Sequence, residues 1–101
     1  MTTIREYTLK KYFVSLTIAN SLWSNKQRLI FKQNIFGTLG ATLAKDYDNL
    51  YLFELKAYSK NAAFQYIQEN IAVVLGEVGA IDTHYYFNIS NTRGYNIHIT
   101  E

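Results

Sequence analysis

Two histidines, His84 and His98, are the side chains of this sequence best suited to proton transfer or metal binding near neutral pH. Both fall in a C-terminal segment that predicts a β-hairpin. In the register given below, His98 lies opposite Asn88, and His84 lies four residues further along the opposing strand. Diagonal neighbours across a hairpin are already ~7–8 Å apart, so the two rings are too far apart to chelate one metal ion. We therefore predict no metal site.

The carboxylates offer a second candidate chemistry, because Asp46 and Asp48 resemble the start of a calcium-binding loop. That loop needs Gly at its sixth position and Glu at its twelfth, where this sequence has Tyr51 and Ala57. The pattern therefore predicts a turn with two solvated aspartates. Glu54 lies in the middle of a predicted strand, where we expect an ion pair with a lysine of a neighbouring strand.

Nucleophilic and phosphate-binding motifs are missing from the sequence. No serine lies in a G-x-S-x-G elbow, and the glycine pair Gly37 and Gly40 lacks the lysine of a phosphate-binding loop. The chain has no cysteine, which excludes disulfides, thiolate metal sites and cysteine nucleophiles. Without a complete catalytic set, we predict a non-enzymatic protein that uses no cofactor.

Length and composition predict one globular domain over residues 1–101. The chain has 101 residues, of which 49% are hydrophobic and 18% charged, enough apolar material for a core. It has no apolar run of the ~20 residues that span a bilayer and no secretory signal pattern, so we expect a cytoplasmic protein. Nine Tyr, six Phe and no Pro favour a β-rich fold, with a tyrosine-rich contact surface as the alternative.

The C-terminal third predicts the β-hairpin. Residues 81–91 and 95–101 form its strands, and residues 92–94 form a three-residue loop whose glycine suits the left-handed position. In the register that pairs Ile89 with Ile97, the apolar side chains fall on one face. A slip by one residue would mix apolar and polar side chains on both faces, so the register is well specified.

A single strong helix is predicted before the hairpin. Ser59 is a suitable N-cap, and Gly79 is placed to end the helix. The apolar residues between them recur at helical spacing: Phe64, Ile67, Ile71, Val74, Leu75 and Val78. We expect this stripe to pack on the protein's own sheet.

Three strands are predicted upstream. Residues 50–58 suit a central strand, and alternation over residues 7–19 favours another, although part of that segment also fits a helical stripe. Residues 28–36 fit a strand or a helix, and the adjacent Leu29, Ile30 and Phe31 favour the strand. The sum is an α+β domain: a mostly antiparallel sheet of about five strands, including the C-terminal hairpin, with one amphipathic helix on one face.

A local resemblance suggests an alternative fold. Residues 50–67 run from a strand through a serine turn into a helix, which resembles the third strand and second helix of RNA-recognition-motif domains. The resemblance implies a ferredoxin-like arrangement. Those domains stack bases on a Gly-aromatic-Gly-Phe signature, but this chain has Leu52-Phe53-Glu54-Leu55 there. The resemblance therefore does not extend to RNA binding.

Charge divides unevenly along the chain. Residues 1–33 contain six basic residues and one acidic residue, whereas residues 34–101 contain four basic and seven acidic. If the fold keeps the basic third together, its face could meet nucleic acid or an acidic protein surface. The alternative is that the lysines only solubilise and protect exposed strands.

These features favour a small inhibitor that binds a protein partner stoichiometrically. Such proteins are encoded by phages and mobile elements as anti-CRISPR, other anti-defence or toxin-immunity proteins. The predicted contact residues are Trp23, Lys26, Arg28, Lys32, Tyr12, Lys10 and Arg93. The first alternative is a nucleic-acid-binding domain, with Lys26, Arg28 and Lys32 on one face of one strand. The second is a self-associating subunit, a homodimer formed through edge strands or through helix packing.

Overall fold

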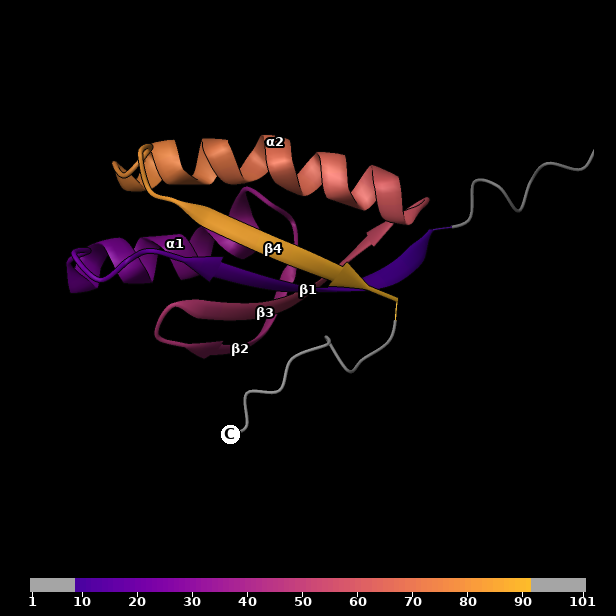
Figure 1. Cartoon of the computed structure of the whole chain (residues 1–101), viewed down its shortest axis with the longest axis horizontal. Coiled ribbons are helices and arrows are strands. Elements are labelled where there is room, and N and C mark those ends of the chain that lie inside the picture. Colours follow the sequence, from indigo (N-terminus) through magenta and orange to yellow (C-terminus); the bar gives the residue numbers. More distant parts are fainter. Residues whose placement is uncertain (1–8, 92–101) are drawn as a thin grey trace, which may run out of the picture.

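A four-stranded antiparallel sheet and two helices make up residues 9–91, the part of the chain that the computed structural model describes (Figure 1). The elements in chain order are β1 (Lys10–Ile18), α1 (Asn25–Gly37), β2 (Thr42–Tyr47), β3 (Leu50–Ala57), α2 (Lys60–Val78) and β4 (Tyr85–Ser90). The strands are ordered β2-β3-β1-β4. This combination of chain order and strand order is the ferredoxin-like arrangement, the alternative that the sequence suggested.

The predicted α+β class with an antiparallel sheet is confirmed, but the element count is corrected. The described residues contain four strands and two helices, in place of about five strands and one helix. The first strand of the predicted hairpin corresponds to β4. The second, residues 95–101, lies outside the described residues, as does Arg93.

Alternation along the two central strands builds the core. On β1, Val14 and Leu16 are fully buried beneath the helices, and on β3 the same is true of Phe53. Successive strand side chains point to opposite faces, so these residues line one face together. The predicted strands over residues 7–19 and 50–58 are confirmed as β1 and β3.

Residues 28–36 lie within helix α1, so the strand predicted there is wrong. Ser24 and Gln27 form a reciprocal capping box: the Gln27 amide N–H donates to Ser24 Oγ at 3.1 Å, and the Ser24 amide N–H donates to Gln27 Oε1 at 2.9 Å. Phe31 and Ile35 then face the core at 0% exposure. The cap starts a helix, and these two side chains attach it to the sheet.

The predicted helix after residue 59 is confirmed as α2. Ser59 Oγ accepts a hydrogen bond from the Ala62 amide at 3.0 Å, and Gly79 ends the helix in the left-handed conformation with φ of 79°. Ile67 and Ile71 are fully buried against the sheet, as the apolar stripe predicted.

Both helices lie side by side on one face of the sheet (Figure 1). Gln27 Nε2 of α1 donates to the Val78 carbonyl of α2 at 3.2 Å. Thr38 Oγ1, just after α1, donates to Glu77 Oε1 at 2.7 Å. The first turn of α1 and the residue after its end are therefore both tied to the last turns of α2.

Two glycines three residues apart at the end of α2 should respond to the same substitution in opposite ways. Gly79→Ala places a Cβ on a left-handed residue and should lower the free energy of unfolding by about 1–2 kcal/mol. Gly76 is helical, and its added Cβ would meet Ile81 Cδ1 at an ordinary 3.9 Å. Gly76→Ala should therefore raise the free energy by about 0.5–1 kcal/mol. Urea denaturation measures both, and shifts in the same direction would contradict this account.

Candidate protein-binding surface

The side of α1 that faces away from the core carries large apolar side chains. Leu29 is 53% exposed and Phe36 is 73% exposed, and a spacing of seven residues places both on the same side of a helix. Leu22, in the turn before α1, is 96% exposed. We call Leu29 and Phe36 the outer α1 surface.

The outer α1 surface has no role in the core. A surface helix ordinarily carries one apolar stripe toward the core and polar residues on the opposite side. In α1 the core stripe is already supplied by Phe31 and Ile35, so the outer side chains add apolar area on the side where polar residues are expected. Scattered exposed apolar residues need no explanation, but aligned ones opposite a complete core stripe indicate a contact surface.

Trp23, one of the predicted contact residues, anchors the start of α1. Its Nε1 donates to Thr83 Oγ1 at 3.2 Å, in the turn before β4. Its ring meets Phe31 edge-on, with ring centroids 5.3 Å apart, and Phe31 meets Tyr51 in the same way at 5.0 Å. This partly buried indole joins α1 to the body of the protein.

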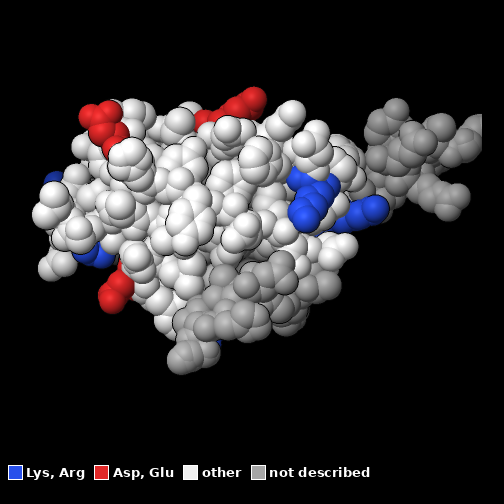
Figure 2. All heavy atoms as spheres, viewed as in Figure 1, with Lys and Arg blue, Asp and Glu red and all other residues white. Residues whose placement is uncertain are grey.

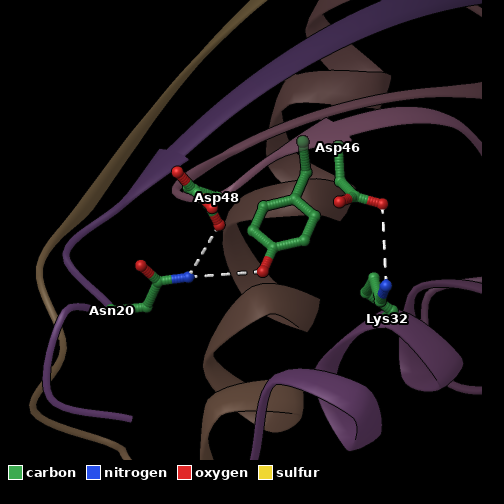
Figure 3. A network of polar contacts seen from close by, with 5 residues as sticks. Asn20, Lys32, Asp46 and Asp48 are labelled. Carbon is green, nitrogen blue, oxygen red and sulfur yellow. Dashed lines mark hydrogen bonds and ion pairs between the residues drawn. The ribbon is translucent and has the colours of Figure 1, made fainter. Parts of the chain in front are cut away.

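A buried amide organises the polar contacts at this end of the sheet (Figure 3). Asn20 is 2% exposed, and its Nδ2 donates to the Asp48 carbonyl at 3.0 Å and to Tyr51 Oη at 3.3 Å. Arg28 Nη2 donates to the Asn20 carbonyl at 2.8 Å. Asn20 therefore connects the start of α1 to the turn between β2 and β3.

Lys32 also contacts the sheet from α1. Its Nζ lies 3.7 Å from Asp46 Oδ2 on β2 (Figure 3). Both side chains are 39% exposed, so this surface ion pair positions the two elements more than it stabilises them. Two of the three basic residues of α1, Arg28 and Lys32, thus have partners within the protein.

The basic residues therefore do not form the predicted face. Lys26, Arg28 and Lys32 lie on a helix, where a two-residue step turns by about 200°, so Lys26 and Arg28 point to opposite sides. The prediction of one strand face is wrong for this reason. Their contact with a partner stays a prediction.

The remaining predicted contact residues are dispersed. Tyr12 is 5% exposed and belongs to the core, because it lies on the helix-facing side of β1, so it is not part of the outer α1 surface. Lys10 is exposed at the start of β1. Phe53, which stands in the segment resembling RNA-recognition-motif domains, is fully buried beneath the helices and presents no ring for base stacking.

The opposite end of the sheet carries an apolar groove of about 640 Å³. Its charged lining residues are Lys11, Glu54 and Lys56. Lys11 Nζ lies 3.5 Å from Glu54 Oε1, which confirms the ion pair expected for that carboxylate. Tyr66 Oη, also in the lining, donates to the Leu39 carbonyl at 2.7 Å. The groove therefore offers apolar packing surface beside the ion pair of Lys11 and Glu54.

The Tyr51 phenol should make stability fall at high pH. Burial raises its pKa above the ordinary value of about 10, and the hydrogen bond from Asn20 opposes that rise. The folded state therefore keeps the proton to higher pH than the unfolded state. The stabilising contribution is complete below pH 10 and is lost as pH rises through the folded pKa.

Urea denaturation at several values between about pH 8 and pH 11 tests this expectation. The free energy of unfolding should fall more steeply in the wild type than in Tyr51→Phe, which keeps the ring contact with Phe31 but has no proton to lose. Equal slopes for the two proteins would show that Tyr51 does not carry the effect.

Nothing in the described region marks a metal site or a membrane span. Among residues 9–91, no three His, Asp or Glu side chains are placed to hold one metal ion. Neither helix in that range is long and apolar enough to cross a bilayer. Comparisons of the chain with models of protein families, with curated proteins and with solved structures give no match.

Proposed function

We propose that this protein is a non-enzymatic binding protein that acts through a stoichiometric complex with another protein. The observation that carries the proposal is the outer α1 surface, where Leu29 and Phe36 are exposed opposite a complete core stripe. The proposed class is that of small inhibitors of phages and mobile elements, which include anti-CRISPR, anti-defence and toxin-immunity proteins. The small single domain and the lack of a catalytic set in the sequence support that class.

The chemistry of α1 specifies the kind of partner. The helix has three basic residues and no acidic one, and Lys26 lies exposed one turn before Leu29. A helix that presents apolar side chains at seven-residue spacing suits an apolar groove, the common mode of helix recognition. The partner surface is therefore an apolar groove with an acidic rim.

Burial of the outer α1 surface supplies the binding energy. Full burial of a Leu or Phe side chain is worth about 1.5–3 kcal/mol, and these two are already partly covered, so each should contribute about 1–2 kcal/mol. Replacement of both should weaken the complex at least tenfold, because ~1.4 kcal/mol corresponds to a factor of ten.

The test is affinity capture from a lysate of the native host, with and without nuclease, followed by measurement of affinity for the protein recovered. Wild type and Val73→Ser, a control at a 49% exposed position of α2, should retain one dominant protein after nuclease. The double variant Leu29→Ser and Phe36→Ser should bind it at least tenfold more weakly with unchanged stability. Equal affinity of the double variant and the control would refute a role for α1.

Nucleic-acid binding is the alternative, and the cationic character of α1 is the observation that favours it. Captured material that disappears with nuclease would support it over a protein partner. Binding would then weaken steeply with added salt and in Lys26→Ala. Lys26 is the informative position, because Arg28 and Lys32 also have structural contacts whose loss would confuse the result.

A further inference from the structure

The two edges of the sheet differ in their protection against another strand. Edge strands expose backbone groups that can pair with a second chain, and natural proteins block them with charges and bulges. β2 has both: its pairing with β3 shifts between Leu43 and Lys45, and Lys45 and Asp46 are exposed. This edge is therefore protected.

β4 forms the other edge and has none of these protections. Its sequence, YYFNIS, contains no charged residue and no proline, and its pairing with β1 runs without a shift. Within residues 9–91, β4 pairs only with β1. Figure 2 shows a broad uncharged surface where Figure 1 places β4, bordered by acidic side chains at the top of the view and basic side chains at the right.

The backbone pattern identifies which groups of β4 point to the edge. The Ala19 amide donates to the His84 carbonyl at 2.9 Å, so the hydrogen-bonding groups of His84 point toward β1. Hydrogen-bonding direction alternates along a strand. The amide and carbonyl groups of Tyr85, Phe87 and Ile89 therefore point outward.

A hollow lies beside this edge, between β4 and the start of α2. It has a volume of about 590 Å³, and its walls include Phe64, Phe87 and Ile89, with Lys60 and Asn61 at its polar end. The rings of Phe64 and Phe87 lie 5.0 Å apart. An added strand would thus find an apolar hollow next to backbone donors and acceptors that no other strand of residues 9–91 pairs with.

We propose that β4 pairs with β4 of a second copy of this chain, antiparallel, about a two-fold axis at Phe87. In this register Phe87 pairs with Phe87 of the second copy, and Tyr85 pairs with Ile89 of the second copy. All three outward-pointing residues then exchange hydrogen bonds across the axis. The helix-facing side chains of the two copies stay on one face, which a one-residue slip would not allow.

The chemistry of β4 favours a second copy over a different protein. Two-fold pairing places each residue opposite a residue of the same strand, so a charged edge would bring like charges together, whereas β4 is neutral. Tyr85 of the second copy lies beside Ile89, at the hollow. Its ring can fill the apolar part, and its hydroxyl can reach toward Lys60 and Asn61.

A charge-swap experiment on the full chain tests the proposal. Tyr86 and Asn88 are exposed on the face away from the helices and would lie opposite each other across the axis. Sedimentation equilibrium over a wide concentration range should give a dimer for the wild type. Tyr86→Lys with Asn88→Lys should raise its dissociation constant at least tenfold, and so should Tyr86→Glu with Asn88→Glu. A mixture of the two variants should recover a mixed dimer, because Lys then faces Glu.

The control separates this proposal from the proposed function. Leu29→Ser with Phe36→Ser should leave the dimer intact, because α1 lies away from this edge. A wild-type monomer at every concentration would overturn the proposal. A dimer insensitive to both charge variants, or sensitive to the α1 variant, would overturn it too. Circular dichroism establishes that each variant is folded.

Discussion

The buried Asn20 amide is the contact on which the placement of α1 depends. A buried amide without hydrogen-bond partners is costly, so its donors and acceptors must be satisfied by particular neighbours. Asn20 finds them on the turn between β2 and β3 and on Tyr51, while Arg28 holds its carbonyl from α1. Asn20 thus connects the end of β1 both to the first turn of α1 and to the hairpin formed by β2 and β3. This junction fixes where α1 begins, and the burial of Phe31 and Ile35 decides which side of the helix faces outward.

The sequence predicted correctly those elements whose apolar residues recur with one clear spacing. β1 and β3 alternate, and α2 has one apolar stripe between a serine cap and a left-handed glycine. α1 has two apolar sides, and Leu29 next to Ile30 and Phe31 obscures the helical period. The signal that identifies it is the capping pair Ser24 and Gln27, a serine followed three residues later by a glutamine.

The candidate binding surface was harder to predict from the sequence, because the exposure of a side chain depends on the tertiary structure. Tyr12 and Trp23 are aromatic residues whose exposure depends on which face the tertiary structure covers, and both turn inward. Lys26, Arg28 and Lys32 share a face only on a strand, and the helix turns Lys26 away from Arg28. Leu29, which helps to obscure the helical period, is also part of the outer α1 surface. A local conflict between sequence pattern and fold is where a functional surface is expected.

Trp23 makes one junction of this protein observable by fluorescence. It is the only tryptophan of the chain, so the intrinsic indole fluorescence has a single origin. That origin lies where the turn before α1 meets the turn before β4, through the bond to Thr83 and the edge contact with Phe31. Emission wavelength and quenching therefore report on one defined junction, whereas an ordinary fluorescence signal averages over several. A change in indole emission without a change in backbone circular dichroism would mark α1 leaving the sheet as an intact helix, whereas global unfolding changes both signals.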